Sequence, residues 1–222
     1  LRKVGIPEEL SHKYSKESAD EILFIDTVAS LYGRNNLQDL VSKVSEKIRL
    51  PLCVGGGIRS LEEAKKLLRK GADKISINTE AINSPNIINE MSKSFGSQSL
   101  VVSIQAKRKE KGNWEAYFNN GREKSNKNIV DWTLEVVDRG AGEILLTSID
   151  QDGTKLGPDY DLISKISNLV DIPVIVSGGI RGYEDIIKLV NMGVRAVAVA
   201  HILHFNVDNI IRIKEKLIEN KV

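Results

Sequence analysis

The chain has 222 residues, 41% of them hydrophobic, with a formal net charge of +2 and a single cysteine. This size and composition predict one or two domains with a substantial core, and the small charge argues against nucleic acid or a membrane surface as a partner. Because no apolar run approaches ~18 residues and one cysteine cannot form an intramolecular disulfide, we expect a protein of the reducing cytoplasm without a transmembrane helix.

Short apolar segments alternate with amphipathic stretches along the chain. Pro7 can start a first helix, and the stretches 61–69 and 183–190 have helical periodicity, with Ser60 and Glu63 positioned to cap the first of them. The apolar segments are rich in Val, Ile and Leu, as expected of strands buried on both faces of a parallel sheet. The predicted strands are 22–26, 52–54, 74–77, 100–105, 143–149, 174–176 and 196–200.

One insertion interrupts this alternation. Residues 114–118 alternate loosely between apolar and polar, and the sequence Asn-Asn-Gly at 119–121 is a hairpin-turn signal. We therefore predict a β-hairpin insertion at about 107–125, in the loop after the fourth predicted strand. The basic run 107–111 is predicted to be a solvated arm, with contact between Lys107 and a phosphate as the alternative.

Several segments of the chain recur 122 residues later. The repeated pairs are 51–59 with 173–181, 19–23 with 141–145, and Gly71 with Gly193. An offset that is constant over three segments indicates two duplicated halves, at about 1–98 and 99–222. Strands that alternate with helices in both halves predict one TIM (β/α)8 barrel domain over 1–222.

The predicted strands number seven rather than eight. The strand 100–105 opens the second half, and subtracting 122 places its counterpart upstream of Leu1. We therefore expect the first barrel strand to be missing from this chain. The two strand edges beside it would then remain unpaired.

Each half has a glycine-rich turn directly after a strand. Because glycine lacks a Cβ, such turns let backbone N–H groups approach an anion. Each turn alone could be a structural tight turn, but two related turns predict two phosphate pockets and a substrate with a phosphate at each end. The candidate residues are Gly56, Gly57, Asn78 and Thr79 in the first half, and Ser177, Gly178, Gly179, Ala200 and His201 in the second.

Polar residues also mark the strand ends where barrel enzymes hold their reactive groups. Asp26 ends one predicted strand, and Asp150 and Asp152 follow another. The latter two could instead only shape their loop, and Gly153 could contact a phosphate. Gln105 ends its strand at the predicted barrel mouth, where an amide can orient a substrate but cannot exchange a proton near neutral pH.

Three charged residues begin strands and should therefore lie at the opposite end, the barrel bottom. Glu21 and Glu143 are repeat mates, and Lys74 starts the third predicted strand. They are predicted to form a stabilising ion-pair layer or, alternatively, a gate for a small polar molecule that moves along the barrel axis. Cys53 is predicted to be a core residue, and no residues have metal-ligand spacing, so we expect neither a metal ion nor another cofactor.

The sequence resembles the cyclase subunit of imidazole glycerol phosphate synthase over essentially its whole length. The most specific stretches are 54–60, 71–78, 95–98 and 140–150. The resemblance implies a heterodimer in which a partner glutaminase docks at the barrel bottom and ammonia travels along the axis. At the mouth, a bisphosphate ribulosyl intermediate would be cyclised and cleaved to imidazole glycerol phosphate and an aminoimidazole carboxamide ribotide.

The resemblance also implies roles for individual residues. One phosphate would be held by Gly57, Asn78 and Thr79, the other by Asp152, Gly153, Gly179 and Ala200; the gate would be Glu21, Lys74 and Glu143, with Asp73 and Gln98 in communication with the glutaminase.

Some residues depart from this family pattern. The family's two catalytic aspartates lie on the first and fifth strands, of which the first is expected to be missing, and Gln105 stands on the fifth. His201 stands where the family usually has serine. The segments 28–35 and 103–107 look more like a paralogous branch found with surface-polysaccharide genes, whose members are thought to pass ammonia to an amidotransferase that acts on a sugar.

The sequence therefore supports two main hypotheses. The first is a cyclase of histidine biosynthesis that acts on a bisphosphate substrate. The second is a barrel that docks a glutaminase and delivers ammonia to a sugar amidotransferase of O-antigen biosynthesis, without cyclase chemistry of its own. Gln105 favours the second hypothesis because an acid–base step needs a group that titrates. A sugar-phosphate isomerase is disfavoured by the gate residues and by Gln105.

Overall fold

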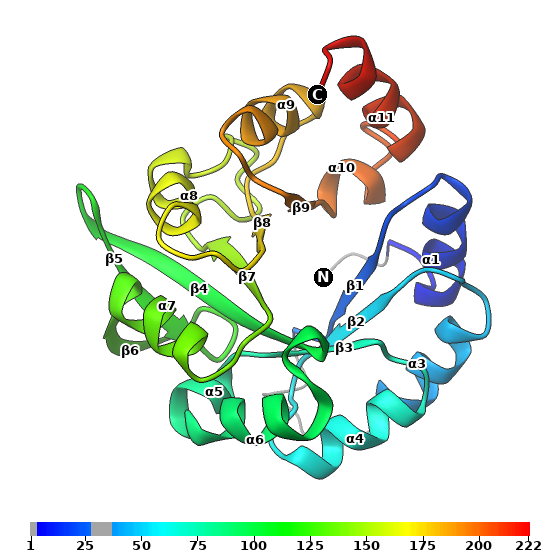
Figure 1. Cartoon of the computed structure of the whole chain (residues 1–222). Helices are drawn as coiled ribbons and strands as arrows, with labels where there is room; N and C mark the ends of the chain where they lie inside the picture. Colours follow the sequence, from blue (N-terminus) through cyan, green and yellow to red (C-terminus); the bar gives the residue numbers. More distant parts are fainter. Residues whose placement is uncertain (1–3, 28–36) are drawn as a thin grey trace.

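Parallel strands form the inner wall of the molecule, and helices pack around their outer side (Figure 1). The structure is a computed structural model that describes residues 4–27 and 37–222. The parallel strands are β1 Ile22–Ile25, β2 Leu52–Gly55, β3 Lys74–Ile77, β4 Leu100–Glu110, β7 Glu143–Ser148, β8 Val174–Ser177 and β9 Ala196–Ala198. Within these residues each strand pairs with the next in that order, which confirms the predicted TIM-barrel class of α/β fold.

The three predicted helices begin where the sequence places them, at Pro7, Leu61 and Tyr183. They are α1 Pro7–Lys16, α3 Leu37–Ser45, α4 Leu61–Arg69, α5 Thr79–Asn83, α6 Asn86–Phe95, α7 Ile129–Asp138, α8 Tyr160–Ser167, α9 Tyr183–Asn191, α10 His201–His204 and α11 Ile210–Glu219, with a 3-10 helix η1 Ser97–Ser99. The Ser60 hydroxyl caps α4 by accepting from the Glu63 N–H at 3.2 Å. The Glu63 carboxylate, however, accepts from the Arg59 N–H at 2.7 Å rather than from Ser60.

The insertion is a three-stranded antiparallel ribbon. β4 continues past the barrel wall and pairs with β5 (Asn113–Phe118), which pairs with β6 (Glu123–Asn128), so the predicted hairpin is confirmed. Residues 107–110 belong to β4, and Lys107, Lys109, Glu110 and Lys111 are exposed, which agrees with the predicted solvated arm. The Arg108 guanidinium stacks 4.6 Å from the Trp114 ring centre and donates to Asp159 at 2.7 Å, which fixes the ribbon against the barrel.

The parallel sheet is open between its first and last strands. In the described part of the chain, β1 pairs only with β2, and β9 pairs only with β8. Every residue of β9 is partly exposed, and so are the last three of β1, whereas all four residues of β2 are buried. The 122-residue repeat predicts a further strand at this position.

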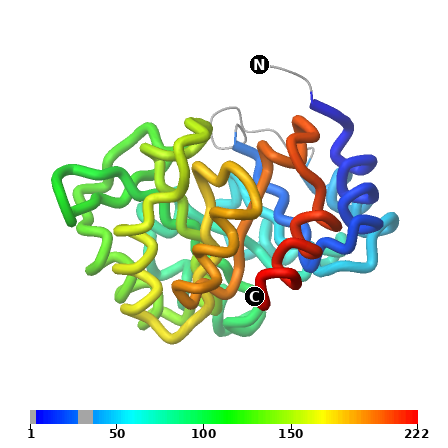
Figure 2. The backbone as a smooth tube through the Cα atoms, turned by 90° about the horizontal axis from the view of Figure 1, so that it is seen from above, coloured from blue at the N-terminus to red at the C-terminus, as the bar shows by residue number. Residues whose placement is uncertain are grey.

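Hydrogen bonds between residues 13–20, in α1 and just after it, and residues 204–214, in α10, α11 and the turn between them, span this opening on the outside of the sheet. Figures 1 and 2 show α1 beside α10 and α11. We call these contacts the clasp: Tyr14 hydroxyl to His204 Nδ1 at 2.8 Å, Lys13 to Asn206 at 2.9 Å, and Lys214 to Asp20 at 2.7 Å. His204 thus has a structural partner in Tyr14.

Side chains on the inner face of the sheet form a small apolar layer of their own. Strand register places Cys53, Val101 and Leu145 on this face, where they contact one another with at most 4% of each residue exposed. Cys53 is therefore a core residue, as predicted. Among the described residues no helix has the length and apolar character needed to cross a membrane.

Candidate functional site

The carboxyl ends of the parallel strands share one rim, and both glycine-rich turns lie on it. Gly56 and Gly57 follow β2, and Gly178 and Gly179 follow β8. The two turns have matching backbone angles, with φ of +104° and +68° in the first and +97° and +80° in the second. These positive values favour glycine over residues that carry a Cβ.

The second turn presents buried backbone donors. Gly178 and Gly179 are buried, and within residues 4–27 and 37–222 their N–H groups donate to no other residue. The Gly179 carbonyl accepts from the Gly157 N–H at 3.0 Å, so the loop after β7 crosses this turn. Buried N–H groups without an acceptor are rare, and they suit a bound anion.

The loop after β7 brings Asp152 to the second turn. A Cβ added at Gly178 would lie 3.5 Å from the Asp152 Cβ, and Gly153 has open space around it. Asp150 has a structural role, since its carboxylate accepts from the Arg108 N–H at 2.7 Å. This contact fits the alternative in which Asp150 shapes the loop.

The other residues predicted for the second pocket occupy neighbouring positions on the rim. Ser177 ends β8 and pairs in register with Thr147 and Ala198. Ala200 follows β9 and is exposed, and the His201 ring lies 4.6 Å from the Phe205 ring. The His201 imidazole therefore already packs against an aromatic ring.

Asp26 lies against the first glycine turn. Its N–H donates to the Gly55 carbonyl at 2.9 Å, and a Cβ added at Gly56 would come within 2.2 Å of the Asp26 carbonyl oxygen. The segment 28–35, on which the likeness to the paralogous branch partly rests, lies outside the described residues.

Asn78 and Thr79 connect the first pocket to the ribbon. The Asn78 amide donates to the carbonyls of Ser103 at 3.0 Å and Tyr117 at 3.1 Å. The Thr79 hydroxyl accepts from the Asn119 N–H at 3.2 Å. Both side chains therefore have structural partners, and both hydrogens of the Asn78 amide are in use.

Gln105 faces the inside of the barrel near the mouth. It pairs in register with Thr147 of β7 and Tyr117 of β5. Its Oε1 is buried and, in the part of the chain that the structure describes, has no hydrogen-bond partner; the same is true of Ser76 Oγ and Glu143 Oε2. Such unsatisfied acceptors call for an explanation, and a bound donor would supply one.

Glu21, Lys74 and Glu143 meet at the bottom of the barrel, as the sequence predicts. The Lys74 ammonium donates to Glu21 at 2.6 Å and to Glu143 at 2.8 Å, with the three side chains between 18% and 26% exposed. Burial by itself lowers the pKa of Lys74, but the hydrogen bonds that Lys74 donates to Glu143 and Glu21 outweigh it and raise that pKa above its ordinary value. The lysine is therefore held in its charged form.

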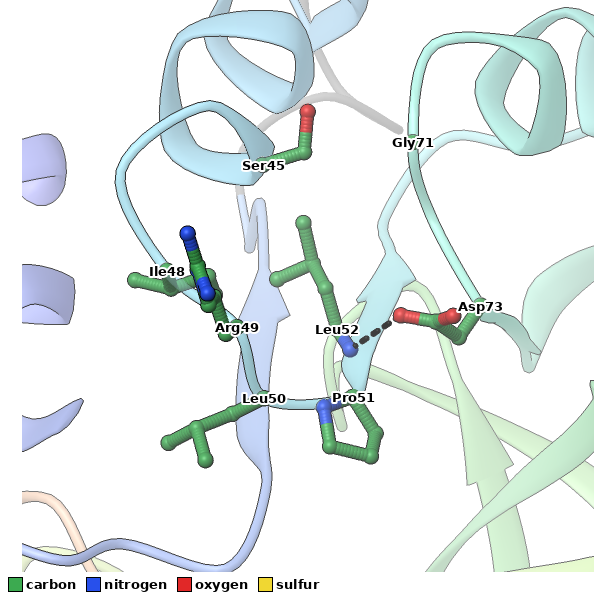
Figure 3. Close-up of a pocket in the computed structure, with 8 residues that line it drawn as sticks. All are labelled: Ser45, Ile48, Arg49, Leu50, Pro51, Leu52, Gly71 and Asp73. Atoms are coloured by element: carbon green, nitrogen blue, oxygen red, sulfur yellow. Dashed lines mark hydrogen bonds between the residues drawn. The ribbon is translucent and has the colours of Figure 1, made fainter.

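A pocket of about 350 Å³ opens on the same bottom face, between the loops that lead into β2 and β3 (Figure 3). Asp73 lies at its edge, and its carboxylate accepts from the Leu52 N–H at 2.8 Å. Gln98 is exposed in η1, directly before β4, and its amide donates to the Phe95 carbonyl at 3.4 Å. The pocket is lined by Ser45, Ile48, Arg49, Leu50, Pro51, Leu52, Gly71 and Asp73.

Sequence reasoning missed the pocket and one duplicated contact. After each glycine turn an arginine N–H donates to a carboxylate four residues on, from Arg59 to Glu63 at 2.7 Å and from Arg181 to Asp185 at 2.9 Å. The 122-residue offset relates these pairs and could have revealed them. Within the described residues, no cluster of three or more His, Cys, Asp or Glu side chains could hold a metal ion.

Comparisons with known proteins agree on one family. The family described as "Histidine biosynthesis protein" matches residues 1–209. A Legionella pneumophila protein is 50% identical over 185 residues, 83% of this chain and 87% of that protein. A Dictyoglomus thermophilum protein is 45% identical over 222 residues, 100% of this chain and 88% of that protein. Both relatives have the name "Imidazole glycerol phosphate synthase subunit HisF".

Proposed function

Because the chain belongs to the histidine biosynthesis protein family, we propose that it is a cyclase subunit of imidazole glycerol phosphate synthase. It takes ammonia from a partner glutaminase and converts a bisphosphate ribulosyl aminoimidazole carboxamide into imidazole glycerol phosphate and aminoimidazole carboxamide ribotide. Relatives of that name, 45–50% identical over most of the chain, support this assignment. We further propose that it acts in the reducing cytoplasm, to which its single cysteine is suited.

The second glycine turn is the observation that carries the proposal. Its buried Gly178 and Gly179 N–H groups have no acceptor among the described residues. A phosphate bound there would accept from both, with Gly153 leaving space beside it. The first turn has the same backbone angles on the same rim. Two such turns suit a substrate with a phosphate at each end.

The barrel bottom suits delivery of ammonia from a docked glutaminase. Glu21, Lys74 and Glu143 form a charged layer there, and the apolar layer around Cys53 lies between them and the mouth. An apolar layer admits a neutral molecule far more readily than an ion, since burying an unpaired charge is costly. The gate therefore passes ammonia and holds back ammonium. Asp73, Gln98 and the adjoining pocket face the glutaminase.

Gln105 is a specific observation in favour of a second candidate function. Its amide stands at the mouth where the family resemblance places an aspartate, and it cannot exchange a proton. Among the described residues, Asp26, Asp150 and Asp152 follow strands at this rim, and Asp150 accepts from the Arg108 N–H. On this second reading the chain docks a glutaminase and delivers ammonia to a sugar amidotransferase of O-antigen biosynthesis.

One assay separates the two functions. The purified protein is given ammonia and the bisphosphate substrate, and formation of imidazole glycerol phosphate is measured for the wild type and for Gln105→Asp. General acid–base groups contribute roughly 10²–10⁴-fold, so we expect slow wild-type turnover and a rise of at least tenfold in the variant.

The outcomes distinguish the candidates. Turnover that appears or rises in Gln105→Asp supports a cyclase site weakened by the amide. Efficient wild-type turnover contradicts the conduit function. If neither protein turns over but ammonia still passes from a docked glutaminase to an external acceptor, the cyclase function is wrong and the conduit function stands.

A further inference from the structure

Three consecutive basic residues lie on β4 where it leaves the barrel, and two of them have carboxylate partners. Arg108 pairs with Asp159 at 2.7 Å, and Lys109 pairs with Glu115 at 3.1 Å. In the described residues Lys107 has no carboxylate partner, although Glu115 is directly opposite it in strand register. One positive charge of this run is therefore uncompensated.

The uncompensated ammonium leans toward the barrel mouth. Lys107 is two residues beyond Gln105, so both side chains lie on the same face of β4. Lys107 is opposite Glu115, but its Nζ lies 5.6 Å from the ring centre of Tyr117, which is the register partner of Gln105. The side chain thus points back along the strand, away from the ribbon tip.

Tyr117 links this ammonium to the first phosphate pocket. Its carbonyl accepts from the Asn78 amide at 3.1 Å. Two residues further on, the Asn119 N–H donates to the Thr79 hydroxyl at 3.2 Å. The residues predicted to hold one phosphate and the Lys107 ammonium therefore contact the same short segment, residues 117–119 at the end of β5.

We propose that Lys107 supplies the positive charge that binds one phosphate of the substrate, with the Tyr117 ring holding the ammonium in place before the substrate arrives. Glycine N–H groups are neutral donors, and a phosphate dianion gains further from a cation beside it. This inference rests on the proposed function, because that function supplies the bisphosphate. For Lys107 it favours the alternative prediction, contact with a phosphate, over a side chain that is only solvated.

The test measures binding of inorganic phosphate at constant ionic strength. Lys107→Met keeps the length of the side chain and removes its charge, and Lys111→Met makes the same change in an exposed lysine at the ribbon turn. A hydrogen bond to a charged group is worth about 1.5–3 kcal/mol, so we expect Kd to rise roughly tenfold or more in Lys107→Met. Lys111→Met stays within about twofold of the wild type, and Lys107→Arg retains most of the affinity.

Backbone amide NMR shifts locate the effect. In Lys107→Met the phosphate-induced shifts of Thr79 and Asn119 weaken, while those of Gly178 and Gly179 titrate as in the wild type. Unchanged affinity at Thr79, equal losses in both lysine variants, or no phosphate binding by the wild type would overturn the role of Lys107. Normal phosphate binding that depends on Lys107, together with an absence of turnover, would leave this role intact and contradict the cyclase function.

Discussion

Gly179 is constrained by both its backbone angle and its surroundings. Its φ is +80°, and an added Cβ would lie 2.3 Å from the Gly157 carbonyl oxygen, which is backbone and cannot move aside easily. Gly153, in the adjacent loop, has a similar φ of +73° but no atom within 4 Å of the same position. The two glycines therefore form a matched pair for substitution.

We predict that Gly179→Ala destabilises the protein by about 3 kcal/mol or more and abolishes phosphate binding at the second turn, since backbone strain and a steric clash add. Gly153→Ala costs only the strain, about 1–2 kcal/mol. Urea unfolding and phosphate titration of the two variants check this. Equal destabilisation of the two variants would show that the loop after β7 moves aside for a Cβ at position 179.

Lys74 compensates two carboxylates that share a partly buried site. We predict that Lys74→Met destabilises the protein by about 2 kcal/mol, because Glu21 and Glu143 are then left next to each other without a cation. The raised pKa of Lys74 means that its contribution is complete below its ordinary value of 10.5 and disappears as the pH rises through the folded-state pKa. The stability difference between wild type and variant, measured by urea unfolding from pH 7 to 11, should therefore shrink at the alkaline end. A constant difference would contradict a charged role for Lys74.

At the scale of elements, the clasp joins α1 to α10 through Tyr14 and His204. Burial, the nearby His201 and Lys13 together lower the pKa of His204, so the folded protein favours its neutral form. In that form Nδ1 accepts from the Tyr14 hydroxyl. The pKa of the Tyr14 phenol is raised, first by the burial of Tyr14 and further by the nearby carboxylate of Glu17.

We predict that the clasp weakens in acid. Because the folded-state pKa is lowered, the contribution of His204 to stability is present above its ordinary value of 6.5 and is lost as the pH falls through the folded-state pKa. His204→Gln should reduce this pH dependence, and Tyr14→Phe should cost about 1 kcal/mol at pH 8. The exposed His12 on α1 is the control, and His12→Gln should leave the loss of stability at low pH unchanged. Urea midpoints between pH 5 and 8 provide the measurement, and an acid loss that persists in His204→Gln would refute the assignment.

Local patterns predicted most elements, and the exceptions depend on residues far away in sequence. The bounds of β3 and α4 follow from apolar runs and a capping serine, which act within a few residues. The basic run 107–111 is exposed, as its charges suggest, but no local pattern predicts that residues 107–110 continue β4. Their strand is stabilised by Trp114 and by Asp159, which is 51 residues beyond Arg108.

In the candidate site, too, some features follow from patterns visible in the sequence and others from contacts between distant residues. The glycine turns and the charged group at the bottom were predictable because a 122-residue repeat and strand starts are visible in sequence. The use of both Asn78 hydrogens by Ser103 and Tyr117 was not, since no local pattern specifies which carbonyls approach an amide. The orientation of Lys107 over Tyr117 likewise depends on the register between β4 and β5.

At the scale of the whole molecule, the open sheet gives its strands unequal protection. β1 and β9 each have one described neighbour, while β2 pairs on both sides and is buried throughout. We predict that amide hydrogens of β9 exchange with solvent faster than those of β2 by roughly tenfold or more, because local opening of an edge breaks fewer contacts. Hydrogen-exchange mass spectrometry measures this. Equal protection of β2 and β9 would mean that another segment covers the edge.

The clasp has a consequence for how the protein is made. Its contacts join residues about 190 positions apart, such as Tyr14 with His204. At a synthesis rate of about 5–20 residues per second, α1 emerges from the ribosome roughly 10–40 s before α10 has been translated. During that interval the face of α1 that carries Tyr14 lacks its final neighbour and is available to chaperones, so the clasp forms only after α10 has been translated.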